Sequence, residues 1–119
     1  MSAPQTATEV AQHLLSLARE HDHATAELSR LDEAAVRARA RYEITFARAF
    51  LEGEGSVDNR KQAARLLVES EWLDVEIADQ RVRSCRERLR SIAVRIECGR
   101  SFGSAIKAEV SLAQSGVTP

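Results

Sequence analysis

Proline, glycine, cysteine and aromatic residues are all scarce in this chain of 119 residues. It holds two Pro, five Gly and two Cys, and aromatic residues make up 4% of the sequence. So few helix-breaking residues permit long uninterrupted helices, while so few aromatic rings argue against a large globular core. Because hydrophobic residues still make up 44% and charged residues 29%, the composition is typical of long helices and coiled coils.

An excess of charge and a long apolar run are also missing. The formal net charge is −1, so no overall field favours nucleic acid or membrane. No apolar run reaches the roughly 18 residues that a membrane-spanning helix requires. The residues from Met1 to Thr8 are small and polar, unlike a signal peptide. We therefore expect a cytoplasmic protein that does not contact a membrane.

The two cysteines form no C-x-x-C motif, because Cys85 and Cys98 lie far apart along the chain. On one straight helix they would be separated by about 20 Å, which is too far for a disulfide. We expect both thiols to be reduced and Cys85 to serve as a small apolar side chain.

Two apolar tracks with alternating steps of three and four residues organise the chain. The first track is Val10, Leu14, Leu17, His21, Ala24, Leu28, Leu31, Ala35, Ala38, Tyr42, Thr45 and Ala49. The second track is Val68, Glu71, Val75, Ala78, Val82, Cys85, Leu89, Ile92 and Ile96. Such spacing places each track along one side of a helix and predicts coiled-coil packing.

Gly53-Glu54-Gly55-Ser56 separates the two tracks and predicts a turn. We expect one helical domain, 1–119, with a helix over about 8–52, a turn over 53–57 and a helix over about 58–98. Thr6 or Thr8 can cap the first helix, and Ser56 or Asp58 the second. Gly99 is expected to end the second helix, and a short helix is expected over about 103–114.

The distribution of charge favours an antiparallel pair. Residues 9–29 carry a net −3 and residues 81–100 a net +5, whereas residues 30–48 carry +2 and residues 66–80 carry −5. With the turn near residue 55, residue i faces roughly residue 110 − i, so both halves bring opposite charges together. Glu71 would then pair with Arg39 or Arg41. The fold class is therefore an all-α antiparallel coiled-coil hairpin with a short C-terminal helix.

The paired helices carry more apolar residues than one contact between them requires. The surplus residues that we expect to form an oligomer interface are Phe46, Phe50, Leu66, Trp72, Leu73 and Ile77. We expect a second copy of the chain to cover them and to form a helical bundle.

Arginines between Arg81 and Arg100 form the other candidate surface. Arg83, Arg86 and Arg90 are spaced three and four residues apart, so they share one face of a helix. Such a row can contact phosphates, although no aromatic residues interleave with it for base stacking. A row of arginines also serves as a solvated or ion-paired flank of a coiled coil, or as a surface for a protein partner.

No catalytic, cofactor-binding or metal-binding motif is apparent. His21-Asp22-His23 suggests metal ligands, but residues i and i+2 point to different sides of a helix. His21 belongs to the first track, where a polar residue often sets the register of a coiled coil. We expect no enzyme, no cofactor and no metal site.

Two segments carry a resemblance to a family. They are Tyr42 with Ala47-Arg48-Ala49-Phe50-Leu51, Gly55-Ser56 and Arg60-Lys61, and Gly99-Arg100-Ser101-Phe102-Gly103-Ser104-Ala105-Ile106-Lys107-Ala108-Glu109. The chain over roughly 40–112 resembles small helical proteins of unassigned function from phages of actinobacteria. The resemblance implies a viral accessory protein of the host bacterial cytoplasm and brings no catalytic residue.

Three functions are consistent with these patterns. The first is a non-catalytic helical-hairpin protein, a phage accessory protein that self-associates and binds another protein. The alternative is a nucleic-acid-binding factor of a phage recombination or replication module that uses the Arg81–Arg100 helix. A further alternative is a minor component of the virion.

Overall fold

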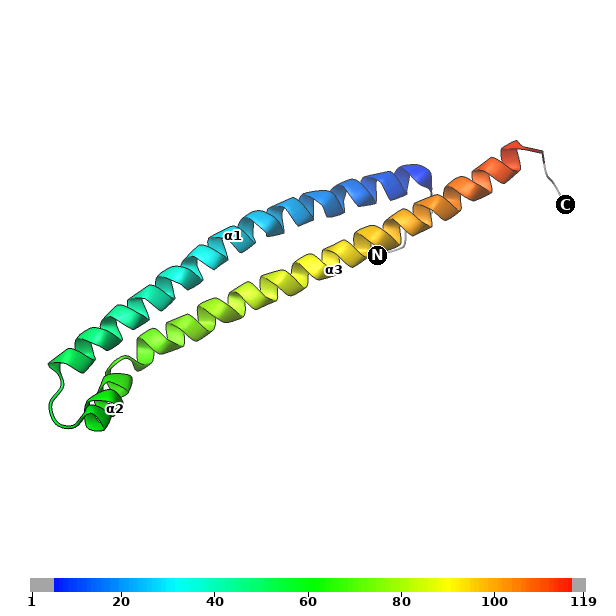
Figure 1. Ribbon diagram of the computed structural model, residues 1–119. Coiled ribbons are helices and arrows are strands. Elements are labelled where there is room, and N and C mark those ends of the chain that lie inside the picture. The colour runs from blue at the N-terminus through cyan, green and yellow to red at the C-terminus, as the bar shows by residue number, and fades with distance from the viewer. Residues whose placement is uncertain (1–5, 117–119) are drawn as a thin grey trace. The chain divides into compact units, whose positions relative to one another are not determined.

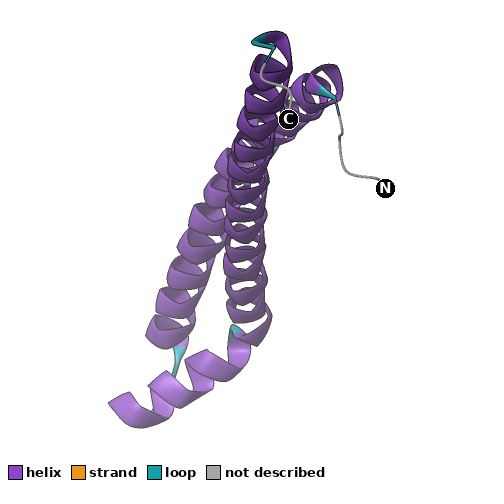
Figure 2. Cartoon of the chain, turned by 90° about the vertical axis from the view of Figure 1, so that its right-hand side faces the viewer, coloured by secondary structure: helices purple, strands orange, loops and turns teal. Residues whose placement is uncertain are grey.

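The computed structural model describes residues 6–116, and helices are the only regular secondary structure among them (Figure 1). The helices are α1 (Ala7–Glu52), α2 (Val57–Leu67) and α3 (Glu69–Gln114). Residues 6–116 contain no strand, and short loops join the helices (Figure 2). The predicted all-α class is confirmed.

The chain divides into two compact units, where the sequence predicts one domain. The first unit is made by the described parts of residues 1–25 and 87–119, and the second unit is residues 26–86. Both long helices contribute to both units, because α1 and α3 each cross a boundary between the two ranges.

The second unit pairs the end of α1 with the beginning of α3 in antiparallel fashion. Arg39 of α1 forms an ion pair with Asp79 of α3 at 2.9 Å, and Asp32 of α1 forms one with Arg86 of α3 at 3.7 Å. The buried side chains of this unit are Ala38, Ala64, Val68, Val75, Val82 and Cys85. All of them except Ala64 belong to the two predicted tracks, which confirms the faces that the spacing predicts.

A glycine and a serine build the turn between α1 and α2. Gly55 has a φ of 96°, a left-handed conformation that other residues adopt only with strain. The Ser56 side chain accepts a hydrogen bond from the Asn59 backbone N–H at 3.2 Å. Ser56 is therefore the N-cap of α2, one of the two residues predicted for that position.

One predicted boundary of the second unit is wrong, because the expected helix over 58–98 is interrupted at Val68. Val68 has φ −107° and ψ 21°, so the chain bends between α2 and α3. The bend lets α2 bury Ala64 and brings Arg60 to the end of α1, where its guanidinium lies 4.7 Å from the centre of the Phe50 ring. These contacts compensate for the interrupted helix.

The predicted register of the second unit is also wrong. Arg39 pairs with Asp79 rather than with Glu71, and Glu71 accepts a hydrogen bond from the Ser70 hydroxyl. The reason is α2: residues 53–68 connect the paired helices, whereas the predicted turn covers only residues 53–57. A longer connection moves each partner on α3 further along the chain.

The first unit pairs the beginning of α1 with the part of α3 up to about Gly103, and the residues of α3 from Lys107 onward are exposed. Thr6 caps α1, since its side-chain oxygen accepts a hydrogen bond from the Glu9 N–H at 3.1 Å. Glu20 and Arg95 lie across the pair with 4.0 Å between their charged atoms. The buried side chains of this unit are Val10, Leu17, Ala24 and Ile92, again on the predicted tracks.

Gly99 does not end a helix, so the predicted end near residue 98 and the separate helix over 103–114 are wrong. A Cβ at Gly99 would lie 2.8 Å from Leu14 Cδ2, and a Cβ at Gly103 would lie 3.1 Å from Val10 Cγ1. Both glycines thus give room to side chains of α1 inside a continuous α3. The three-four spacing of the second track in fact continues from Ile96 through Gly99 and Gly103 to Ile106.

Candidate interaction surface

Large apolar side chains remain exposed around the junction of α2 and α3. Five of them lie within the twelve residues from Leu66 to Ile77, and we call them the junction patch. Its members and their exposed fractions are Leu66 77%, Leu67 71%, Trp72 50%, Leu73 51% and Ile77 42%. Single exposed apolar residues are ordinary, whereas such a concentration is characteristic of a surface that binds another protein.

The structure places the six predicted interface residues in two groups. Leu66, Trp72, Leu73 and Ile77 are exposed members of the junction patch. Phe46 and Phe50 are half-buried in contacts within the chain. The ring centres of Phe46 and Tyr42 are 6.1 Å apart. The ring and the carbonyl of Phe50 both contact the Arg60 guanidinium.

The parts of the two helices that carry the junction patch bear opposite charges. α2 contains three basic residues and one acidic residue, whereas residues 69–80 of α3 contain five acidic residues and no basic one. Within the described chain, no ion pair involves the flanking charges Lys61, Arg65, Glu69, Asp74 and Glu76. These charges are therefore available to a partner.

An open hollow lies beside the patch. It has a volume of about 420 Å³ and is lined by Tyr42 of α1, Arg65 of α2 and Glu69 and Trp72 of α3. Aromatic and arginine side chains are the residue types that contribute most to binding at protein interfaces. The hollow thus offers a partner both aromatic and charged side chains to contact.

Comparisons of the chain with protein-family models, with curated proteins and with solved structures gave no match. The resemblance to small phage proteins accordingly stays a prediction. The function has to be argued from the residues and their arrangement.

The three arginines of the other candidate surface each contact a neighbouring side chain. Arg83 donates a hydrogen bond to the Gln80 side chain at 2.9 Å, Arg86 pairs with Asp32, and Arg90 pairs with Glu87. Arg86 also lines a groove of about 570 Å³ between α1 and α3 of the second unit. Carboxylates beside Arg86 and Arg90 reduce the positive charge that these positions offer to a phosphate.

Other side chains with potential chemistry are dispersed. No group of three or more His, Cys, Asp or Glu that could hold a metal occurs among residues 6–116. Cys85 is buried, Cys98 is exposed, and both are free thiols. None of the described helices is both long and apolar enough to cross a membrane.

Sequence reasoning did not include the flanking charges in the candidate surface. A signal was present, because Lys61 and Arg65 are four residues apart, and Glu69 and Glu76 lie four and three residues from Leu73. These spacings place each group on one face of its helix. The bend at Val68, where the sequence has no glycine or proline, places the two groups on separate helices.

Proposed function

We propose that this chain is a non-catalytic helical interaction protein of the cytoplasm that self-associates and binds another protein. The observation that carries the proposal is the junction patch, in which five large apolar side chains are exposed within twelve residues. Covering such side chains with protein removes apolar surface from water, which is the main driving force of protein association. Trp72 in particular is a residue type that dominates binding energies at interfaces.

Light scattering coupled to size-exclusion chromatography tests self-association. We expect the wild-type chain to have a mass above that of one 13.2 kDa chain at micromolar concentration. The double variant Leu66→Ser/Leu73→Ser should shift the mass toward that of one chain, because it removes two apolar contacts. A wild-type mass of one chain at about 100 μM would contradict the proposal.

A matched control uses two apolar residues of the first unit. Leu15 and Val94 are exposed to 53% and 62%, which is close to the exposure of the patch residues. The variant Leu15→Ser/Val94→Ser makes the same kind of change on helices and should keep the wild-type mass. If both double variants dissociate equally, the junction patch is not the contact.

Binding of another protein is tested by capture from a lysate, with and without nuclease. A protein retained by the wild-type chain and by Leu15→Ser/Val94→Ser after nuclease treatment would support this half of the proposal. Loss of the retained protein on nuclease treatment would instead favour the nucleic-acid alternative. That alternative also predicts binding that weakens steeply with salt. It has less support, because Arg86, Arg90, Arg95 and Arg100 all lie beside carboxylates.

A further inference from the structure

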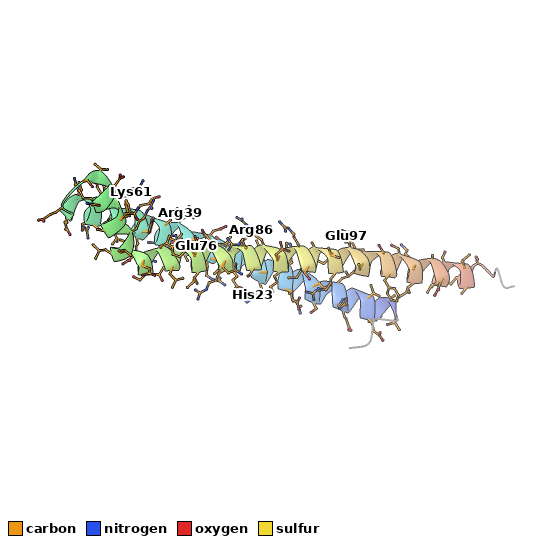
Figure 3. The ribbon with its side chains drawn as sticks, turned by 90° about the horizontal axis from the view of Figure 1, so that it is seen from below. His23, Arg39, Lys61, Glu76, Arg86 and Glu97 are labelled. Atoms are coloured by element: carbon orange, nitrogen blue, oxygen red, sulfur yellow. The ribbon has the colours of Figure 1, made fainter. Side chains whose placement is uncertain are left out.

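The junction patch has the arrangement of a self-complementary surface. Its α2 part carries the basic residues Lys61 and Arg65, and its α3 part carries the acidic residues Glu69, Asp74 and Glu76. Lys61 lies on α2 and Glu76 on α3, and both belong to the second unit (Figure 3). When one helix of a surface is basic and the other is acidic, a rotation of 180° places the basic helix of one copy against the acidic helix of a second copy. The surface is then complementary to a copy of itself.

We propose that the occupant of the junction patch is a second copy of this chain, related by a two-fold axis, with α2 of each copy against α3 of the other. The inference rests on the proposed self-association and adds its surface and its geometry. Under this symmetry Lys61 and Arg65 of one copy face Glu69 and Glu76 of the other, and the reverse contact occurs as well. The arrangement closes at two copies, because the same patch is used by both.

The contacts and the exposure of these charged side chains within one chain agree with this geometry. Arg60, the third basic residue of α2, contacts the Phe50 carbonyl and ring. Its guanidinium is therefore directed toward α1 and not toward a second copy. Lys61 and Arg65 are exposed, as are Glu69 and Glu76, and no ion pair within the described chain occupies them. Leu73 shares a helix face with Glu69 and Glu76, so burying Leu73 against the other copy brings these carboxylates to the contact.

Charge reversal tests the proposal. Lys61→Glu/Arg65→Glu makes positions 61 and 65 acidic like positions 69 and 76, and Glu69→Lys/Glu76→Lys makes positions 69 and 76 basic like positions 61 and 65. Each variant alone should weaken self-association by about tenfold or more, because like charges then face each other twice. An equimolar mixture of the two variants should form a mixed dimer, because every contact again joins opposite charges.

Combining all four substitutions in one chain gives the sharpest control. This chain is acidic at positions 61 and 65 and basic at positions 69 and 76, so it should dimerise with itself while failing to pair with the wild type. A general loss of folding or of apolar contact does not produce such a pattern. Masses are measured by light scattering, and far-ultraviolet circular dichroism checks that each variant is helical.

A cross-linking experiment on the wild-type chain needs no variant. The chain contains only two lysines, Lys61 and Lys107. Carbodiimide treatment of a mixture of ¹⁵N-labelled and unlabelled chains should join Lys61 of one copy to Glu69 or Glu76 of the other, giving peptides of mixed isotope content. Lys107, at the other end of α3, should give no mixed link to Glu69 or Glu76.

The outcomes separate this inference from the proposed function. A wild-type chain with the mass of one copy refutes both. A wild-type dimer whose mass is unchanged by both reversals, or whose Lys61 gives no mixed-isotope link, refutes the surface proposed here and leaves self-association standing. Loss of self-association in each charge-reversed variant, with recovery of a dimer in their equimolar mixture, supports the proposal. Should a reversed chain fail to fold, the cross-link decides.

Discussion

Single residues on the two tracks hold the paired helices together. Ile92 is fully buried, more completely than any other large side chain among the described residues of the first unit. Val94, two positions further along α3, points away and is exposed to 62%. Two aliphatic residues on the same helix thus have opposite environments, which makes them a matched pair for measuring what the track contributes.

Ile92→Ala is expected to lower the free energy of unfolding by about 3 kcal/mol, since it removes buried apolar contacts and leaves a cavity. Val94→Ala should change it by about 0.5 kcal/mol or less, because the side chain is largely in water. Urea unfolding followed by circular dichroism measures both. Equal effects of the two substitutions would show that the track does not form the interior.

Gly99 tests how closely α1 approaches α3. Replacing glycine by alanine within a helix stabilises it by about 1 kcal/mol, but a Cβ here would lie 2.8 Å from Leu14 Cδ2. We expect Gly99→Ala to be nearly neutral in the wild type and to stabilise by about 1 kcal/mol in a Leu14→Ala background, where the collision is absent. Urea unfolding of the four chains of this double-mutant cycle measures the difference.

The control background is Val10→Ala, because Val10 approaches Gly103 rather than Gly99. There Gly99→Ala should behave as it does in the wild type. A Gly99→Ala effect that is the same in all three backgrounds would mean that the Leu14 side chain does not limit this position.

At the scale of elements, α2 depends on its cap. Ser56 accepts a hydrogen bond from the Asn59 N–H, so Ser56→Ala should destabilise α2 by about 1 kcal/mol. Ser56→Asp retains an acceptor at this position and should restore stability. Hydrogen exchange of the α2 amides measures the effect, which should be largest in the first turn. Unchanged exchange in Ser56→Ala would contradict the capping role.

The sequence predicts the paired faces of the elements well and their ends less well. Heptad spacing identifies all the buried residues except Ala64, because periodicity directly reports which side of a helix is covered. Gly99 was interpreted as a helix end because a glycine is a common terminator, whereas here it gives space to Leu14. The bend at Val68 was missed, because it results from tertiary contacts such as that of Arg60 with Phe50 and not from local propensity.

The candidate surface could likewise be predicted only in part. The exposure of Leu66, Trp72, Leu73 and Ile77 could be predicted, because the paired helices carry more apolar residues than the contact between them can cover. Phe46 and Phe50 could not be placed, since their half-buried state depends on Tyr42 and on α2. The assignment of the basic and acidic residues to two separate helices could not be predicted either, because it depends on the bend at Val68 between α2 and α3.

At the scale of the whole molecule, stability and self-association are linked. If the folded chain associates through the junction patch and the unfolded chain does not, mass action stabilises the folded state as concentration rises. A hundredfold increase in protein concentration should then raise the apparent free energy of unfolding per dimer by about 2.7 kcal/mol. The urea midpoint, measured at about 1 and 100 μM, should move upward accordingly.

The same measurement on two variants assigns this dependence to a surface. Leu66→Ser/Leu73→Ser should have a midpoint that is independent of concentration, because its folded chain no longer associates at these concentrations. Leu15→Ser/Val94→Ser removes equally exposed apolar side chains from the first unit and should keep the wild-type dependence. A wild-type midpoint that does not change with concentration would mean that the exposed leucines and Trp72 remain in water. A dependence that persists in Leu66→Ser/Leu73→Ser would place the contact between copies elsewhere on the chain.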